Sequence, residues 1–190
     1  MTDTPPAPAD FHERARRVRL ACFDVDGTLT DGRLFFDSEG RELKAFHVHD
    51  GQGLVLLRRA GIEVALVTAR RSVIVEKRAE ELRLQAFTGI GDKLACVDGI
   101  ARAHGIALDE VAFMGDDLPD LKVMTNVGLS GCPADAHAWV AERARWKSRF
   151  RGGAGAAREF ADALLQAQGH VDRLVADLLA PAPAFIGVQA

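Results

Sequence analysis

Short apolar runs alternate with amphipathic stretches along most of the chain. The runs have the length of strands, and they comprise residues 18–25, 62–69, 111–115 and 127–130, with a further short strand expected at 86–89. The amphipathic stretches predict helices at 51–61, 72–82, 92–105, 134–144 and 155–169. Because apolar strands that alternate with helices form βαβ units, the pattern predicts an α/β fold with a three-layer, Rossmann-like, doubly wound and mostly parallel sheet.

A β-hairpin is expected between the first strand and the first helix. The stretches "LFF" and "LKAFHV" flank "DSEG" within residues 33–48, which places the turn at Ser38–Gly40. His47 and His49 alternate with Val48, so both are expected on one face of a strand, where they either bind a transition metal or lie at a surface. No other long insertion is visible, so the sequence predicts no cap domain.

The two ends of the chain lack the alternation of predicted strands and helices that the middle shows. Residues 1–17 are rich in proline and then in charge, which predicts a mobile N-terminal arm. Residues 18–169 carry the alternating strands and helices and form the predicted domain. Residues 170–190 are a C-terminal extension to which the pattern assigns no role.

Composition narrows the class of protein. The chain has 190 residues, 48% of them hydrophobic, and a formal net charge of -3. These values suit one soluble globular domain and give no support to nucleic-acid binding through a basic surface. No apolar run approaches the roughly 20 residues of a membrane-spanning helix, and the N-terminus lacks the apolar core of a signal peptide. The scattered cysteines, Cys22, Cys96 and Cys132, fit a reducing cytoplasm.

Polar side chains follow three of the predicted strands at the point where each strand ends. Asp24 and Asp26 follow the first strand, Thr68 and Arg70 follow the second, and Asp116 follows the run at 111–115. Ligands of parallel sheets bind beyond the carboxyl ends of the strands. Because those ends meet at one edge, we expect these side chains to form one site.

The chemistry of these residues favours phosphoryl transfer. Asp24, Asp26 and Asp116 would form an oxygen-rich site of the kind that binds Mg²⁺ together with a substrate phosphate. One carboxylate can attack phosphorus to form an aspartyl-phosphate, and a second can protonate the leaving alcohol and later deprotonate water. Thr68 can donate a hydroxyl hydrogen bond to a phosphoryl oxygen, and Lys93 can supply a positive charge.

Four ordered motifs resemble those of the haloacid dehalogenase superfamily of aspartate-nucleophile phosphohydrolases. They are "DVDGTLTDG", "VTAR", "GDK" and "GDDLPD", between residues 20 and 130. The resemblance implies that Asp24 is the nucleophile and Asp26 the general acid–base residue. It implies that Thr68 and Lys93 bind the phosphate. Mg²⁺ would be held by the side chains of Asp24 and Asp116 and by the backbone carbonyl of Asp26.

Longer stretches resemble one capless family within that superfamily, the 3-deoxy-D-manno-octulosonate 8-phosphate phosphatases of lipopolysaccharide biosynthesis. These stretches are "TDGRLFFDSEGRELKAFHVHDGQGLVLLRRAGIEVALVTAR" and "GGAGAAREFADALLQAQG". The resemblance implies a Mg²⁺-dependent phosphomonoester hydrolase that releases the sugar acid and phosphate. It also implies a homotetramer in which the hairpins meet centrally and a C-terminal segment reaches a neighbouring site. The substrate-binding candidates are Arg70, Arg78, Asp50, Gly51 and Arg158.

Several alternatives stay open. The family has arginine where this chain has His49. A nonulosonate 9-phosphate carries a carboxylate and a terminal phosphate, as the octulosonate 8-phosphate does. This compound or another small sugar phosphate is therefore an alternative substrate. A mutase or a non-catalytic regulatory protein on the same fold is a further possibility. Asp117 suits either support of the metal site or a helix N-cap, and Asp120 is expected to be structural. The glycines of residues 152–155 are typical of a flexible linker, or of a segment that enters a neighbouring site.

Overall fold

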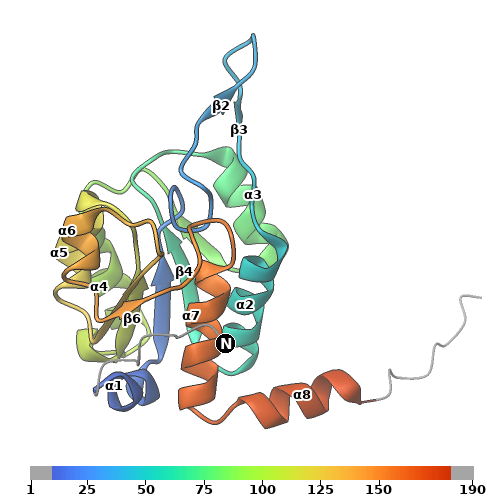
Figure 1. Ribbon diagram of the computed structural model, residues 1–190, viewed down its shortest axis with the longest axis vertical. Helices are drawn as coiled ribbons and strands as arrows, with labels where there is room; N and C mark the ends of the chain where they lie inside the picture. The colour runs from blue at the N-terminus through green and yellow to red at the C-terminus, as the bar shows by residue number, and fades with distance from the viewer. Residues whose placement is uncertain (1–9, 181–190) are drawn as a thin grey trace, which may run out of the picture.

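A six-stranded parallel sheet lies between two layers of helices (Figure 1). The computed structural model describes residues 10–180. The strand order is β5-β4-β1-β6-β7-β8, and every neighbouring pair is parallel. The strands are β1 (Leu20–Phe23), β4 (Glu63–Val67), β5 (Gln85–Phe87), β6 (Val111–Met114), β7 (Leu129–Cys132) and β8 (Trp146–Lys147). The predicted three-layer α/β fold is therefore confirmed.

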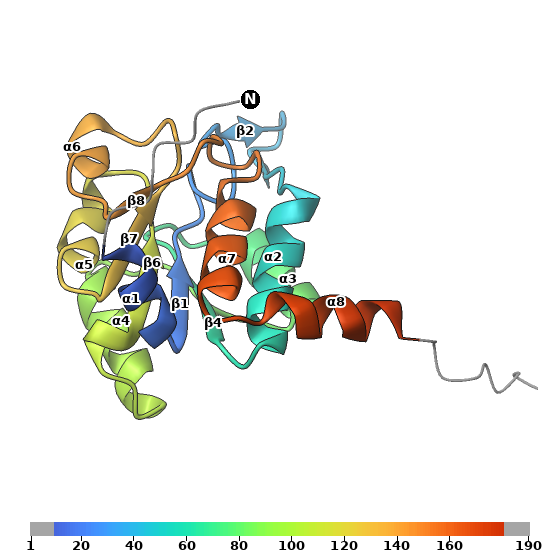
Figure 2. The same ribbon diagram turned by 60° about the horizontal axis from the view of Figure 1, so that its bottom comes forward.

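Helices cover both faces of the sheet (Figure 2). Along β1, Leu20 and Cys22 belong to one core cluster, whereas Ala21 and Phe23 belong to the other, as the alternation of strand side chains requires. The cluster around Phe23 includes buried residues of α1 (Phe11–Arg17), α2 (Val48–Arg59), α3 (Val73–Leu82) and α7 (Ala156–Ala167). The cluster around Cys22 includes buried residues of α4 (Lys93–Ala103), α5 (Leu121–Met124) and α6 (Ala138–Ala141).

The chain reverses its direction across the sheet at β1. It continues from β1 to β4 and β5 on one side, and then returns to β6, β7 and β8 on the other side. Doubly wound sheets bind ligands in the crevice at this switch point, beyond the carboxyl ends of the strands. The crevice between β1 and β6 is flanked by the residues that follow these two strands, Asp24 and Asp116.

The predicted hairpin is present and projects from the body of the molecule (Figure 1). Strands β2 (Phe35–Phe36) and β3 (Glu42–Leu43) are antiparallel. In the turn, Gly40 has φ +76°, a conformation that glycine adopts without steric cost. The hairpin is the sole β structure outside the main sheet in residues 10–180, and no cap domain interrupts this part of the chain.

The region after the hairpin differs from the sequence prediction. Helix α2 begins at Val48 rather than at Gly51, so His47 is its N-cap residue and His49 lies in its first turn. The expectation that both histidines lie on a strand is therefore wrong. An acidic residue in a first helical turn interacts favourably with the helix dipole, and Asp50 supplies one here. The two imidazole rings still meet edge to face, with their centroids 5.1 Å apart.

Both ends of the described chain are more ordered than the sequence pattern indicates. Part of the expected mobile arm, Phe11–Arg17, forms helix α1, because Phe11 and Ala15 are buried against the core. Residues 1–9 lie outside the described residues. The described part of the C-terminal extension forms the amphipathic helix α8 (Val171–Leu179), of which Leu174 is buried, and residues 181–190 lie outside the described residues. None of the described helices is long and apolar enough to span a lipid bilayer.

Two further elements also depart from the prediction. The helix expected at 134–144 is reduced to α6, because the backbone amide of Ala134 donates to the carbonyl of Phe150 and that of His137 donates to the carbonyl of Asp116. Strand β8 was not expected, since two residues carry no readable alternation. Two short 3₁₀ turns, η1 (Leu108–Glu110) and η2 (Leu118–Asp120), flank β6.

The side chain of Phe160 packs helix α7 against the sheet, and its substitution tests this contact. Its side chain is fully buried, edge-on to Phe23 and with its ring centroid 5.0 Å from that of Trp146. We expect Phe160→Ala to lower the free energy of unfolding by about 3–5 kcal/mol, because it removes this packing and leaves a cavity. Phe160→Leu, which keeps most of the volume, should lose much less. Urea unfolding followed by circular dichroism measures both, and an alanine variant as stable as the wild type would contradict this packing role.

Candidate active site

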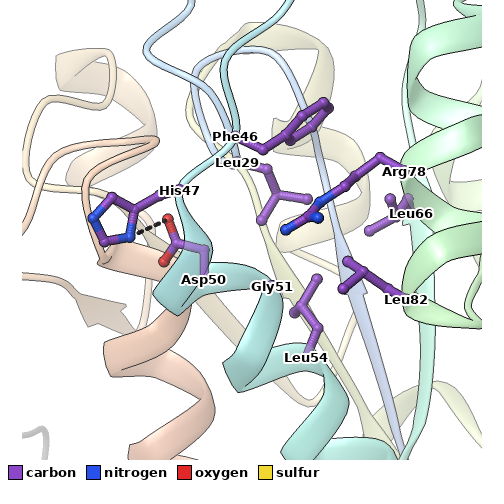
Figure 3. A pocket seen from close by; sticks show the side chains of 9 residues that line it. All are labelled: Leu29, Phe46, His47, Asp50, Gly51, Leu54, Leu66, Arg78 and Leu82. Carbon is purple, nitrogen blue, oxygen red and sulfur yellow. Dashed lines mark ion pairs between the residues drawn. The ribbon is translucent and has the colours of Figure 1, made fainter.

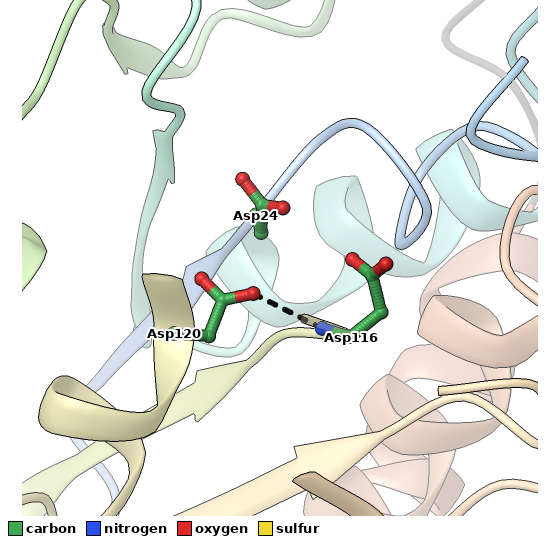
Figure 4. A group of neighbouring side chains, drawn as sticks. All are labelled: Asp24, Asp116 and Asp120. Carbon is green, nitrogen blue, oxygen red and sulfur yellow. Dashed lines mark hydrogen bonds between the residues drawn. The ribbon is translucent and has the colours of Figure 1, made fainter. Parts of the chain in front are cut away.

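Three carboxylates gather at the carboxyl ends of β1 and β6 (Figure 4). Asp24 follows β1, Asp116 follows β6, and Asp120 ends the short turn η2. One oxygen of each lies within 4.8 Å of the others. Asp24 is only 6% exposed and Asp120 only 1%. The parallel sheet thus brings together Asp24 and Asp116 as the sequence predicted, and it adds Asp120, for which a structural role was expected.

The loop after β1 is folded closely around Asp116. Gly27 has φ +93°, and a Cβ atom at this position would lie 2.0 Å from Oδ2 of Asp116. Only glycine satisfies both constraints. The next residue, Thr28, is fully buried, and its hydroxyl donates to Oδ1 of Asp116 over 3.0 Å. Sequence analysis missed Thr28, although its place directly after Gly27 puts it at the turn of the loop.

Lys93 supplies the positive charge of the cluster. It is the first residue of α4, after the N-cap Asp92, whose side chain accepts from the amide of Ala95 as the sequence predicted. Lys93 is 5% exposed. Its Nζ lies 2.7 Å from Oδ1 of Asp24 and 2.5 Å from Oδ1 of Asp120. The predicted phosphate-binding lysine therefore lies against the predicted nucleophile.

Asp120 links Lys93 to the backbone after β6. Its Oδ2 accepts from the backbone amides of Asp116 at 3.1 Å and Asp117 at 3.3 Å, while Oδ1 takes the hydrogen bond from Lys93. Asp117 itself is the N-cap of η2, and its side chain accepts from the amide of Leu118. The N-cap alternative is the one that the structure bears out for Asp117.

Crowding of like charges shifts the proton affinities of the cluster. Burial, and then repulsion from Asp120, raises the pKa of Asp24 to about 8 despite the attraction of Lys93. Burial, and again repulsion from Asp120, raises the pKa of Asp116 to about 7. Burial lowers the pKa of Lys93, but attraction to Asp24 and Asp120 outweighs this effect, and the pKa lies above its usual value.

The cluster suits a divalent cation with a preference for oxygen. Two buried carboxylates and the partly buried carboxylate of Asp116 face one ammonium group, so the ionised site carries an excess of negative charge that a further cation would neutralise. Carboxylate oxygens together with substrate phosphate are the ligands that Mg²⁺ takes in phosphoryl-transfer sites. The side chains of Asp24 and Asp116 are thus suited to hold Mg²⁺.

The remaining predicted catalytic residues lie at the same edge of the sheet. Thr68 follows β4 and is 2% exposed, and its hydroxyl oxygen accepts from the amide of Arg70 over 3.3 Å. The guanidinium Nε of Arg70 lies 3.9 Å from Oδ2 of Asp26. Oδ1 of Asp26 pairs with Lys44, which directly follows the hairpin strand β3. The loops after β1 and β4 therefore meet at the base of the hairpin.

Three of the substrate-binding candidates line a separate small pocket with a cavity volume of about 10 Å³ (Figure 3). Asp50, Gly51 and Arg78 contribute to its wall. The guanidinium of Arg78 lies over the ring of Phe46 and would overlap a Cβ atom at Gly51, 2.4 Å away. The residues that line the pocket are Leu29, Phe46, His47, Asp50, Gly51, Leu54, Leu66, Arg78 and Leu82.

The structure gives Asp50 and Arg158 contacts away from the carboxylate cluster. Asp50 is 1% exposed, and its two oxygens accept from the backbone amides of Gly155 and Arg158 at the start of α7. The side chain of Arg158 pairs with Asp162 on its own helix, with Nε–Oδ1 at 2.8 Å. Neither side chain is brought to Asp24, so any contact with substrate is at a distance from the phosphoryl site.

The glycine-rich segment before α7 packs on the loop after β1 of the same chain. A Cβ atom at Gly152 would lie 1.8 Å from the carbonyl oxygen of Gly27, and the amide of Gly153 donates to the carbonyl of Thr28 over 3.0 Å. The sequence suggested that these glycines form a flexible linker or a segment that enters a neighbouring site. Both interpretations are wrong for Gly152 and Gly153, which pack on their own chain. Their lack of side chains permits a close backbone contact.

The chain is similar to known proteins over most of its length. The 3-deoxy-D-manno-octulosonate 8-phosphate phosphatase of Escherichia coli is 42% identical over 168 residues, which cover 88% of this chain and 89% of that protein. The crystal structure of a hypothetical protein from Xanthomonas campestris matches with a TM-score of 0.90 and 54% identity, over 95% of this chain and 100% of that one. Comparison with protein-family models gave no match.

A third similar protein was solved with ligands. It is the 3-deoxy-D-manno-octulosonate 8-phosphate phosphatase of Moraxella catarrhalis in complex with a magnesium ion, a phosphate ion and a KDO molecule. Its TM-score is 0.87 at 36% identity, over 90% of this chain and 99% of that one.

The raised pKa values predict how magnesium affinity depends on pH. Mg²⁺ binds the ionised carboxylates, and protons compete with it below the pKa values of about 7 for Asp116 and about 8 for Asp24. We therefore expect the affinity to rise by about tenfold or more from pH 6 to pH 8 and to level off above that, since each displaced proton contributes up to about tenfold per pH unit. Isothermal titration calorimetry at several pH values measures this.

Two variants serve as controls for that titration. Asp116→Ala removes a ligand and should weaken Mg²⁺ binding strongly at every pH. Asp109→Asn changes an exposed carboxylate in η1, at the opposite edge of the sheet, and should leave both affinity and pH dependence unchanged. An affinity that is flat or falls between pH 6 and pH 8 would contradict the assignment of these groups.

Proposed function

We propose that this chain, which belongs to the 3-deoxy-D-manno-octulosonate 8-phosphate phosphatase family of the haloacid dehalogenase superfamily, hydrolyses 3-deoxy-D-manno-octulosonate 8-phosphate to the sugar acid and phosphate. The observation that carries the proposal is the cluster of Asp24, Asp116 and Asp120 with Lys93, at the switch point of the sheet. Such a cluster holds a metal and a phosphoryl group beside a carboxylate nucleophile.

In the first step, a carboxylate oxygen of Asp24 attacks phosphorus. The bond from phosphorus to the sugar oxygen breaks, and the departing oxygen takes a proton from the carboxylic acid of Asp26. Lys93 lies 2.7 Å from Asp24, which supports a role for its charge in stabilising the negative charge that develops on the phosphoryl oxygens. Thr68, buried at the end of β4, supplies a hydroxyl donor at the same edge.

In the second step, water attacks the aspartyl-phosphate of Asp24. Asp26, now a carboxylate, takes the proton from that water, and the bond between phosphorus and the Asp24 oxygen breaks. Free phosphate leaves, and both carboxyl groups return to their starting states. Mg²⁺, when bound by Asp24 and Asp116 and by the backbone carbonyl of Asp26, neutralises charge on a phosphoryl oxygen and orients it.

Recognition of the sugar acid requires a cation for its carboxylate. Arg70 is the candidate nearest the acid–base residue, since its Nε lies 3.9 Å from Asp26. A guanidinium group suits a carboxylate because it offers paired donors in one plane. Arg78, in the pocket of Figure 3, together with Asp50 and Gly51, would contact the substrate only if the sugar extends toward α2. Arg158 would act from α7.

We propose further that the chain forms a homotetramer through its hairpins. The hairpin region exposes apolar side chains, which are Leu34, Phe35, Phe36 and Leu43. Contiguous exposed apolar groups of this kind mark interaction sites. The C-terminal segment that would approach a neighbouring site is then helix α8, because residues 152 and 153 are packed on their own chain.

We also propose that the protein is located in the cytoplasm. All three cysteines, Cys22, Cys96 and Cys132, are free thiols. Proteins of reducing compartments keep their cysteines in this state.

Phosphate release from a panel of substrates tests the proposed function. With Mg²⁺ present, we expect kcat/KM for 3-deoxy-D-manno-octulosonate 8-phosphate to exceed that for a nonulosonate 9-phosphate and for simpler sugar phosphates by about a hundredfold, or roughly 2.7 kcal/mol of transition-state binding. Asp24→Asn should abolish turnover while the thermal unfolding curve stays close to that of the wild type. A flat substrate profile would refute the proposed substrate, and an active Asp24→Asn variant would refute the nucleophile.

Light scattering after size-exclusion chromatography tests the assembly. We expect the mass of a tetramer for the wild type and a smaller mass for Phe36→Ser combined with Leu43→Ser, because these polar replacements weaken an apolar interface. Trp139→Ser is the matched control, since Trp139 is also 57% exposed but lies in α6. A monomeric wild type, or a hairpin variant of unchanged mass, would refute the proposed interface.

A further inference from the structure

Lys44 is a buried cation at the base of an exposed hairpin. It directly follows β3, and its side chain is 1% exposed, whereas the preceding Leu43 is 60% exposed. A lysine is almost never buried to this degree unless its charge is paired. The partner is the carboxylate of Asp26, the residue to which the proposed function gives both proton transfers.

The pair belongs to a closed ring of four alternating charges. Lys44 Nζ contacts Oδ1 of Asp26 and lies 3.4 Å from Oε1 of Glu42. Glu42 accepts from the guanidinium of Arg70 over 2.9 Å, and Arg70 Nε returns to Oδ2 of Asp26 at 3.9 Å. The ring therefore links the hairpin, the loop after β1 and the loop after β4. With two cations and two anions, no charge in it is left uncompensated.

Within this ring, the two oxygens of Asp26 have different environments. Oδ1 is taken by Lys44. Oδ2 is buried and has no hydrogen-bond partner among the described residues. Asp26 thus has one engaged oxygen and one oxygen without a partner, and the unpartnered Oδ2 is the oxygen that remains for proton transfer to a leaving alcohol and from water.

Holding one oxygen has a direct consequence for proton transfer. The terminal torsion of an aspartate side chain is broad and soft, so a carboxyl group without a partner samples many orientations. A general acid must lie within hydrogen-bond reach of the atom that it protonates, and a misplacement of about 1 Å can reduce the rate about a hundredfold. A partner on Oδ1 restricts Asp26 to orientations in which Oδ2 stays available.

We propose that Lys44 is the positioning residue for the acid–base carboxylate of Asp26, so that the hairpin forms part of the active site. This inference rests on the proposed function, in which Asp26 protonates the leaving alcohol. Lys44 touches neither phosphorus nor the leaving oxygen in this scheme, and it acts through the carboxylate that it holds. Glu42 and Arg70 complete the ring and fix Lys44 in turn.

Comparison of two leaving groups tests this role. The value of kcat/KM reports the steps up to departure of the alcohol. A sugar alkoxide needs a proton from Asp26 in order to leave, whereas the nitrophenolate of p-nitrophenyl phosphate leaves without one. For Lys44→Met, we expect kcat/KM to fall by about 10- to 100-fold for the sugar phosphate and by less than about threefold for p-nitrophenyl phosphate. Asp26→Asn should show the same selective loss, and more strongly.

Matched variants separate positioning from a purely structural effect. Lys44→Arg keeps a cation near Oδ1 and should recover much of the sugar-phosphate activity. Lys77→Met is the same substitution at an exposed position of α3 and should leave both substrates unchanged. Circular dichroism and the thermal unfolding curve check that each variant folds. If Lys44→Met does not fold, Lys44→Ser, whose short polar side chain cannot reach Oδ1 of Asp26, replaces it with the same expected selectivity.

The outcomes distinguish this inference from the proposed function. An equal loss for both substrates, or no loss for either, would overturn the positioning role. If the wild type hydrolyses p-nitrophenyl phosphate and glycerol phosphate but not 3-deoxy-D-manno-octulosonate 8-phosphate, the proposed substrate is wrong, and glycerol phosphate then takes its place in the same comparison. A selective loss for the alkyl phosphate would still support Lys44.

Discussion

The structure is organised around the repulsion between three carboxylates that share one buried corner with a single ammonium group. Asp24, Asp116 and Asp120 would separate in water, yet the ends of β1 and β6 hold them within a few ångströms of one another. The surrounding chain is adapted to this cluster. Gly27 has no side chain that would collide with the Asp116 carboxylate, and Lys93 lies at the start of α4, from which its ammonium group contacts Asp24. Such a site is poised to gain free energy by taking up a cation and a phosphate together.

The parts of this arrangement that depend on parallel strands could be predicted from the sequence. Apolar runs of strand length fix which segments are buried, and the carboxyl ends of parallel strands must meet, so Asp24, Thr68 and Asp116 could be assigned to one edge without coordinates. The helix from Lys93 to Ala103 was also predictable, because Asp92 and Gly105 mark its two ends. In each case, a local pattern and a general rule of topology are enough.

The parts that depend on contacts between distant segments could not be predicted. Lys44 is a lysine at the end of an exposed hairpin, which normally indicates a solvated side chain, and only the fold reveals that it is buried against Asp26. Helix α1 forms because Phe11 packs into a core that consists of residues from distant segments, and the sequence of residues 10–17 alone does not indicate this packing. Asp120 was expected to be structural from its place in the chain, and its Oδ2 does accept from nearby backbone amides, yet its other oxygen accepts from Lys93 on another helix.

The close contact between Gly152 and the loop at Gly27 also bears on how the protein is made. The loop with the catalytic aspartates leaves the ribosome early, but the backbone against which it packs emerges only after almost all of the sheet has been synthesised. Contacts between segments so far apart in sequence form slowly, because a long chain must first close. The nascent chain would thus carry every catalytic side chain well before it has an ordered active site, and the enzyme matures only when its last helices dock.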